Sequence, residues 1–452
     1  MTSTRDAFYA ERDRRTRQYG GHDDALERPI HLIVSPDVTA TRPGQIATLA
    51  LVNLIARAHR RLVTEIPDAP LQARSLVPAS DLQTAATRTA LAINPVLDMT
   101  DGAGTPIRIG LGQQVPNGLE LYLGWLGGRG TASITPFTAD ELDPESVFGA
   151  ATAAVLGAAA VFRLAHDQPI RTTRFNPIEL AADHDAGARD HRTPIDVGDV
   201  LAVGAGAVTA ALVYWLRELG ISHGMWDFLD HDEAELHNTN RCMTMTAAQA
   251  GWPNGEPAIA AANKAVTVAR AIGGRSHPVW YDQWSPHQQA RHDLVLPLAN
   301  ERGVRRLIAQ RGEPLLLHAT TSPNWTAELH RHLPDRDDCI DCRLPDNTTP
   351  QMRCSTGPVD VTNSKSPDAA LPFLSAAAGL MLAAALAALP NGPAMTGRMN
   401  HWQLDLTLST PLLRHHQHQQ LQACREQPSA ALRRLISESE PRRWDYLDHA
   451  NE

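Results

Sequence analysis

Lysine is almost missing from this chain: of its 41 basic residues, only Lys264 and Lys365 are lysines. A chain that uses arginine nearly everywhere should keep lysine mainly where a planar guanidinium does not suit the chemistry. The lysine ammonium is a compact point charge on a flexible stem, and this shape suits a polyphosphate in a narrow pocket. Lys264 is therefore a candidate site residue, with chance retention as the competing explanation.

Cysteine is sparse as well, and none occurs in the first 241 residues. The odd number of five cysteines and the lack of a signal peptide indicate a protein of the reducing cytoplasm rather than a disulfide scaffold. Two of them, Cys339 and Cys342, have the spacing of a zinc knuckle, although one pair supplies only two of the four ligands of a tetrahedral zinc site. The five are Cys242, Cys339, Cys342, Cys354 and Cys424.

An excess of basic charge is lacking too, and one long apolar run is present. The formal net charge is −9, which offers no basic footprint for nucleic acid. The stretch 371–389 is apolar enough to raise the question of a membrane span, but alanine dominates it and no basic anchors flank it. A buried helix is the better interpretation. At 452 residues the chain has room for two or three domains.

A glycine loop stands where a predicted strand passes into a helix. The segment 196–203 ends in a short apolar run typical of a buried strand, Gly204 and Gly206 follow at once, and 210–219 is an apolar helix. Glycines let the backbone approach a phosphate, and the free N–H groups at a helix N-terminus attract negative charge. This loop alone would also suit a nucleotide-dependent oxidoreductase.

Acidic and basic residues follow the next predicted strand, 225–229. Asp230 and Asp232 stand at its end, where an acid binds ribose hydroxyls or caps a turn. Asn238 and Arg241 come next. Hydride transfer develops no charge on a phosphate and needs no arginine here, whereas chemistry at an α-phosphate does. The pattern therefore favours adenylation over an NAD-dependent oxidoreductase.

Together with Lys264, these residues make the chain resemble the ThiF/MoeB/HesA superfamily, whose members are related to the ubiquitin-activating enzymes. The motif of that superfamily reads D-x-D-x-V-x-x-S-N-L-x-R-Q and is followed by a lysine on the next helix. The chain matches the motif at Asp230, Asp232, Asn238 and Arg241. It departs from the motif at Ala234, His237, Thr239 and Cys242. The resemblance covers roughly 197–424, half of the chain.

The resemblance implies an α/β fold with a doubly wound, Rossmann-like, mostly parallel sheet. It also implies ATP- and Mg²⁺-dependent adenylation of a C-terminal carboxylate to an acyl-adenylate. The substrate would be a ubiquitin-like protein, a sulfur-carrier protein or a peptide precursor, in a cytoplasmic homodimer with no nucleic acid and no membrane. A non-catalytic relative that binds nucleotide or a partner is the alternative, followed by an oxidoreductase.

The resemblance also implies a role for each residue of the motif. Arg241 and Lys264 would stabilise the charge that develops on the phosphates. The residues that would bind ATP are Gly204, Gly206, Asp230, Asp232 and Asn238.

Three further positions depart from the family's pattern or complete it. Asn300 stands where relatives place an aspartate that binds Mg²⁺, and a neutral amide oxygen contributes no charge to offset the dication. Cys354 stands where the thiazole-forming branch keeps a reactive thiol, although a small buried residue would explain it equally well. Cys424, with a histidine from 415–418, would join the Cys-x-x-Cys pair in a Zn²⁺ site, or that site is lost.

The sequence predicts four segments. Residues 1–180 form an α/β module without a glycine loop, for recognition or dimerisation, or a degenerate half of the activating fold. Residues 181–195 are a polar linker, and 196–345 are the ATP-binding adenylation domain. Residues 346–452 are a C-terminal part with the thiol loop and an alanine-rich helix that would help to form the homodimer. The first 28 residues are charged and are expected to be mobile or to form an arm.

Overall fold

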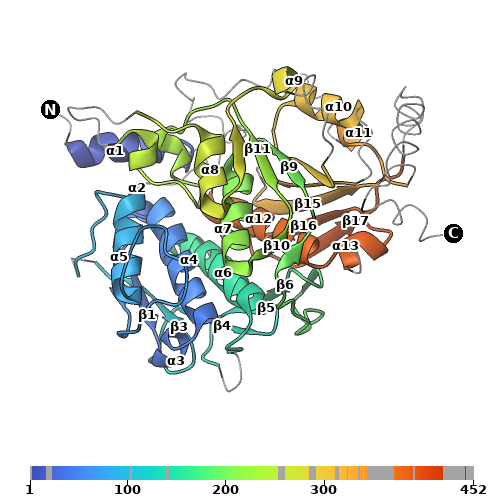
Figure 1. Cartoon of the computed structure of the whole chain (residues 1–452). Coiled ribbons are helices and arrows are strands. Elements are labelled where there is room, and N and C mark those ends of the chain that lie inside the picture. The colour runs from blue at the N-terminus through green and yellow to red at the C-terminus, as the bar shows by residue number, and fades with distance from the viewer. Residues whose placement is uncertain are drawn as a thin grey trace.

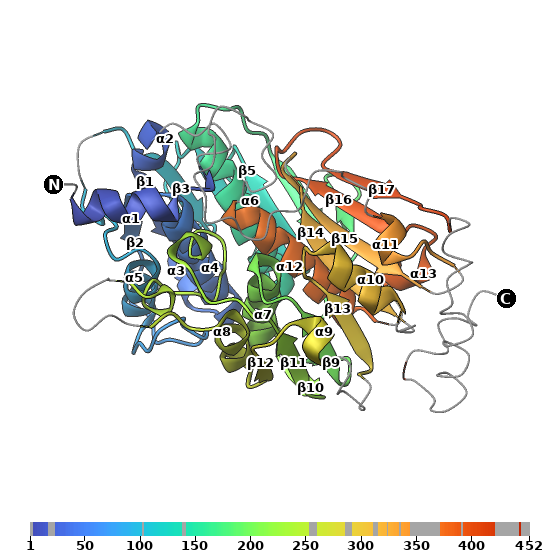
Figure 2. The ribbon, with the colours of Figure 1, turned by 90° about the horizontal axis from the view of Figure 1, so that it is seen from above.

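The protein consists of two α/β units, each built on one large sheet, in a computed structural model (Figure 1). Helices of both units lie between the two sheets (Figure 2). The structure describes residues 3–16, 23–101, 104–137, 142–252, 260–284, 292–310, 315–322, 324–333, 336–343, 371–389, 392–420 and 443.

The first unit contains a seven-stranded sheet in the order β2-β1-β3-β4-β5-β6-β7. Its strands are β1 (Ile30–Val34), β2 (Leu62–Glu65), β3 (Ile107–Leu111), β4 (Leu121–Leu126), β5 (Arg129–Ser133), β6 (Thr173–Asn176) and β7 (Ala181–Ala182). The first four in that order run parallel, and the last three continue the sheet antiparallel. The expectation that 181–195 is only a linker is wrong at its start, because Ala182 pairs with Phe175 of β6.

The second unit contains an eight-stranded sheet in the order β12-β11-β9-β13-β14-β15-β16-β17. Its strands are β9 (Val200–Val203), β11 (Trp226–Leu229), β12 (Arg275–His277), β13 (Leu294–Pro297), β14 (Leu316–Thr321), β15 (Thr326–His332), β16 (His401–Asp405) and β17 (Leu413–His416). The first five in order are parallel and the last three antiparallel. A separate parallel pair joins β8 (Ile195–Asp196) to β10 (Ile221–His223). The predicted mostly parallel, Rossmann-like α/β fold class is confirmed, and β16 and β17 complete the same sheet as the predicted ATP-binding segment.

Side-chain caps fix where several helices begin. Thr41, Ser146 and Asn263 each accept a hydrogen bond from the backbone N–H three residues further on, at the starts of α4, α6 and α8. The helices are α1 (Thr4–Arg12), α2 (Asp23–Glu27), α3 (Pro36–Thr39), α4 (Arg42–Ala58), α5 (Leu82–Ile93), α6 (Val147–Ala165), α7 (Ala207–Leu219), α8 (Lys264–Ile272), α9 (Tyr281–Trp284), α10 (Arg302–Gln310), α11 (Ile340–Arg343), α12 (Pro372–Ala387) and α13 (Pro393–Thr396), with short 3₁₀ turns η2 (Leu236–Asn238) and η3 (Ala248–Ala250).

The two units meet through α4 and α6 of the first and α7 and α12 of the second. Gly379 of α12 packs so closely on α7 that an added Cβ would lie 2.6 Å from the backbone nitrogen of Leu212. Every residue of α12 is buried, which confirms the predicted buried helix. Among the described residues, one helix, α6, is long and apolar enough to cross a membrane, but 83% of the apolar window lies buried inside the protein. Both helices therefore serve as the core between the sheets.

Candidate nucleotide-binding site

A cavity of about 340 Å³ lies at the carboxyl ends of β9, β11, β13 and β14. Open α/β sheets bind their ligands at this edge. Eight residues that the sequence singled out line this one cavity: Gly204, Gly206, Asp230, Asp232, Asn238, Arg241, Lys264 and Asn300. The structure therefore brings the predicted nucleotide residues together, while their individual roles remain predictions.

The glycine loop forms the wall of the cavity between β9 and α7. Gly204 has a φ of +97°, and an added Cβ would lie 2.6 Å from the backbone nitrogen of Ala299, so only glycine fits. An added Cβ at Gly206 would meet nothing within 4 Å, so the position where a side chain would stand is open space. Since Gly206 is the N-cap of α7, unpaired N–H groups of the first helical turn lie beside this space.

Asp230 connects the glycine loop to the acidic turn after β11. One carboxylate oxygen accepts the N–H of Ala205 at 2.7 Å, and the other accepts the N–H of Asp232 at 2.9 Å. Burial raises the pKa of Asp230, and the nearby Lys264 ammonium opposes that shift. The Asn263 side chain donates to the carbonyls of Asp230 and Asp232, both at 3.0 Å, and so fixes this turn against α8.

Lys264 is the first residue of α8 and points into the cavity. Its side chain is only 7% exposed, and its Nζ lies 2.7 Å from Oδ2 of Asp232. The backbone N–H of Lys264 also donates to the carbonyl of Asp232 at 2.9 Å. The acidic turn thus holds both the backbone and the ammonium group of this lysine.

Asn238 and Arg241 lie in the turn that begins with η2. The side-chain oxygen of Asn238 accepts the N–H of Glu235 at 2.9 Å, so any contact of Asn238 with phosphate would use its amide N–H groups. Arg241 is 8% exposed and donates to the carbonyl of His237 at 2.9 Å and to Oδ1 of Asn240 at 3.0 Å. These contacts hold the guanidinium at the cavity wall.

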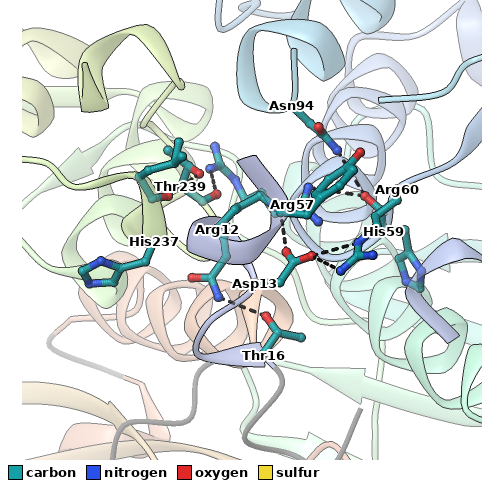
Figure 3. Close-up of polar contacts among 12 residues, drawn as sticks. Arg12, Asp13, Thr16, Arg57, His59, Arg60, Asn94, His237 and Thr239 are labelled. Carbon is teal, nitrogen blue, oxygen red and sulfur yellow. Dashed lines mark hydrogen bonds and ion pairs between the residues drawn. The ribbon is translucent and has the colours of Figure 1, made fainter. Parts of the chain in front are cut away.

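Sequence reasoning missed Arg15, which reaches the same cavity from the N-terminal arm. Of the two expectations for the first 28 residues, mobility is wrong for residues 3–16, which form an arm whose helix α1 packs against η2. The Asp13 carboxylate lies between the guanidinium groups of Arg12 and Arg60, at 2.5 and 2.9 Å, and all three side chains are buried (Figure 3). The neighbouring Thr16 hydroxyl accepts a hydrogen bond from Asn240 at 3.0 Å.

Arg305 and an aromatic wall complete the lining. The Arg305 guanidinium is 6% exposed and donates to the carbonyl of Ala299 at 2.7 Å, and burial lowers its pKa to about 10, so it stays charged at neutral pH. Trp280 and His231 stack with ring centroids 4.9 Å apart and planes 10° apart. Both rings line the cavity next to Asp230.

The three cysteines in the described part of the chain lie at the cavity and at α11. Cys242 is 2% exposed and also lines the cavity. Cys339 and Cys342 lie at α11, where Cys339 Sγ accepts the N–H of Cys342 at 3.4 Å. The predicted thiol Cys354 and the predicted zinc ligand Cys424 lie outside the described residues.

Comparisons with known proteins give partial matches. Residues 29–176 match the family model of the BilD N-terminal domain. The uncharacterized protein y4jF of Sinorhizobium fredii is 26% identical over 340 residues, which cover 72% of this chain and 62% of that protein. Structures of E. coli MccB, one with ATP and one with AMPCPP and MccA, align with 50% of this chain at TM-scores of 0.35 and 0.36 and identities of 14% and 13%.

The alignments cover 66% and 65% of those MccB chains, so this chain spans less than two thirds of the length of each of these relatives. The matched family domain lies in the first unit, whereas the cavity lies in the second. The chemistry of the cavity therefore follows from its own residues.

Proposed function

We propose that the protein is an adenylyltransferase. ATP would bind in the cavity, and the C-terminal carboxylate of a peptide or protein would attack its α-phosphorus. This step would form an acyl-adenylate and release pyrophosphate. The observation that carries the proposal is that four cationic side chains meet a glycine loop and an acid around one cavity. The four are Arg15, Arg241, Lys264 and Arg305.

The cations suit phosphate chemistry better than hydride transfer. As the bond between the α- and β-phosphates breaks, negative charge collects on the leaving pyrophosphate, and donors fixed in advance stabilise that charge strongly. Arg241 and Lys264 are both nearly buried, so water screens them little. A phosphate oxygen would take the place that Asp232 occupies beside Lys264.

The rest of the cavity suits the nucleoside. Asp230 stands next to the glycine loop, where its carboxylate would accept hydrogen bonds from ribose hydroxyls. The aromatic rings of Trp280 and His231 offer flat apolar faces for adenine at the same end.

Mg²⁺ fits the donor atoms of the cavity edge. Asp232, Asn300 and Glu301 all line it, and carboxylate and amide oxygens are the ligands that Mg²⁺ prefers. Glu301 would supply the negative charge that Asn300 lacks. The ion would neutralise charge on the phosphates, while the arginines and Lys264 hold them in place.

The carboxylate substrate is proposed to be the C-terminus of a ubiquitin-like protein, a sulfur-carrier protein or a peptide. Transfer from the adenylate to Cys354 and a zinc site at Cys339, Cys342 and Cys424 remain proposals. The homodimer also remains a proposal; the helix on which it depended, α12, is already covered by α6 and α7 within one chain.

Pyrophosphate exchange tests the function. Labelled pyrophosphate should enter ATP only when a carboxylate substrate is present, and peptides with a free C-terminal glycine should be compared with the same peptides amidated. Exchange with the free acids and none with the amides supports the proposal. ATP binding without exchange for any carboxylate would favour a non-catalytic nucleotide-binding protein.

Asn300 is a specific reason to consider a non-catalytic protein. Its neutral side chain is exposed at the cavity edge, where a carboxylate would bind Mg²⁺ more strongly. For a working enzyme, Asn300→Asp should raise exchange at low Mg²⁺ and change little at saturating Mg²⁺. If the wild-type protein and Asn300→Asp both lack exchange, the non-catalytic function is the better one.

A further inference from the structure

Histidines form a row across the antiparallel end of the second sheet. His318 pairs with His330, His330 with His401, and His401 with His416, so the four occupy facing positions on β14, β15, β16 and β17. The rings of His318 and His330 stack at 4.3 Å, and those of His330 and His401 at 4.2 Å. Such a row concentrates metal-binding side chains on one face.

Glu328 lies on the same face of the sheet and draws two of these rings together. Its Oε2 lies 3.4 Å from Nε2 of His330 and 3.3 Å from Nε2 of His401. The three ligand atoms lie within 4.8 Å of one another. His330 is 3% and His401 7% exposed, so the group is not a chance meeting of surface side chains.

A second carboxylate with two histidines provides an internal comparison. The buried Asp227 lies 2.6 Å from Nε2 of His277 and 2.8 Å from Nε2 of His292. These are ordinary charge-assisted hydrogen-bond lengths, about 2.7–2.9 Å. The contacts of Glu328, at 3.3 and 3.4 Å, are longer than these by 0.5 to 0.8 Å. Their length matches the distance between two ligand atoms of a tetrahedral site in which each ligand lies roughly 2.0–2.1 Å from a central zinc ion.

Neighbouring side chains hold Glu328 and His401 in position. The other oxygen of Glu328, Oε1, accepts hydrogen bonds from Thr326 at 2.7 Å and from Gln403 at 3.1 Å. Nδ1 of His401 lies 3.1 Å from Nε2 of His418. Contacts of this kind orient metal ligands and fix which ring nitrogen carries the proton.

We propose that Glu328, His330 and His401 bind a divalent transition-metal ion, with zinc as the ion that these ligands fit best. None of these three ligands belongs to the Cys339–Cys342 pair or lines the nucleotide cavity, although the neighbouring Thr320 does line it. Three protein ligands leave a fourth position for water or for the hydroxyl of Thr320, which lies 3.3 Å from Nε2 of His330.

Metal binding would break one hydrogen bond of Arg343. Its NH1 lies 3.1 Å from Nδ1 of His330 and 3.3 Å from the carbonyl of Asn400. A histidine that binds zinc through Nε2 keeps its proton on Nδ1. NH1 must then turn toward Asn400. The ligands come from β15 and β16, so the ion would join these two strands.

The test uses full-length, tag-free protein in which Cys339→Ser and Cys342→Ser remove the thiol pair. After chelator treatment, saturation with zinc and desalting, this protein should retain about one equivalent of zinc by elemental analysis. Adding Glu328→Gln or His401→Ala should lower the affinity more than a hundredfold, since even the partners of metal ligands are worth roughly 10–100-fold. His415→Ala, an exposed histidine of the same hairpin, is the matched control and should retain zinc.

A Co²⁺-loaded sample of the double-serine protein covers the case in which a ligand variant fails to fold. It should show the visible bands of tetrahedral Co²⁺ without a thiolate charge-transfer band. Zinc below about a tenth of an equivalent, or zinc kept in both ligand variants, would overturn the proposal. Zinc content is measured without turnover, so this result is independent of the proposed adenylation.

Discussion

In each unit a central strand, β1 or β9, leads to a helix between the sheets, α4 or α7, and then to a parallel neighbour, β2 or β11. Each sheet then ends in three antiparallel strands, and a long apolar helix, α6 or α12, stands between the first and second of them in the chain. The two units therefore share one topology around their central strands, while the role of the N-terminal module stays a prediction.

The units differ in the segment that leaves the central strand. After β9 the glycine loop leaves space, because an added Cβ at Gly206 would meet nothing within 4 Å. After β1 the chain enters α3, and Ser35 and Val38 fill the equivalent space against Gly112, where an added Cβ would lie 2.1 and 2.6 Å from their side chains. The same path therefore leaves an open loop, the proposed phosphate site, only in the second unit.

The first unit contributes to that site from outside instead. Its N-terminal arm is anchored on Arg60 of the first unit and carries Arg15 into the cavity of the second. The two units would thus divide the roles: the second binds the nucleotide, and the first supplies a cation and its share of the apolar interface.

The largest effect should come from the lysine of the second unit. Lys264→Ala should lower pyrophosphate exchange by about two orders of magnitude, as when one donor to a developing charge is lost. Lys365→Ala, which removes the other lysine of the chain, is the control and should exchange like the wild type. Exchange within threefold of the wild type in Lys264→Ala would remove Lys264 from the site.

Alanine substitutions at the two loop glycines, Gly204 and Gly206, should have different effects, the first on stability and the second on ATP binding. Gly204→Ala forces a side chain into a left-handed backbone and against Ala299, so it should lower the free energy of unfolding by about 2 kcal/mol in urea titrations. Gly206→Ala should leave that free energy unchanged but raise the KM for ATP, because its methyl group enters the cavity. Equal stability losses in both variants would contradict the open loop.

Arg15 tests whether the first unit assists the second. Arg15→Ala should lower exchange about tenfold, or roughly 1.4 kcal/mol, because one of four cations is lost from the cavity. Arg14→Ala is the matched control, since Arg14 contacts His237 at 3.0 Å and does not line the cavity. If both variants lose activity equally, the arm matters only for folding.

The sequence predicted the fold class and most of the cavity, because these features are local. A strand, a glycine loop and a helix follow one another within a few residues, and Asp230, Asn238 and Lys264 come soon after. Arg15 was missed because its position depends on α1 packing, through Phe8 and Tyr9, on a turn more than 200 residues away.

The strands β15, β16 and β17 escaped prediction for a different physical reason. One face of these strands carries histidines, Glu328 and Gln403, so they lack the apolar run that marked β9. Their pairing is visible only when the whole sheet is assembled. The proposed metal site was hidden for the same reason, because His330 and His401 are 71 residues apart in the chain.

The smallest expected effect is a dependence of the free energy of unfolding on acid pH. It comes from His59, which lies in the first unit where the N-terminal arm is anchored. His59 is buried beside Arg12 (Figure 3), and burial first, then His166 and Arg12, lowers its pKa to about 3. In the unfolded chain its pKa is about 6.5. Between these values the unfolded chain binds a proton that the folded chain does not, so stability falls as the pH falls below about 6.5 and is unaffected above it.

One such histidine contributes at most about 1.4 kcal/mol per pH unit. His59→Phe keeps the edge-to-face packing on Phe162 and removes the titration. In urea titrations at pH 7, 6 and 5, the loss of unfolding free energy should therefore be smaller in His59→Phe than in the wild type by up to that amount per unit. The exposed His415→Gln should follow the wild type. If the free energy of unfolding falls with pH equally in all three proteins, His59 does not make the folded protein sensitive to acid.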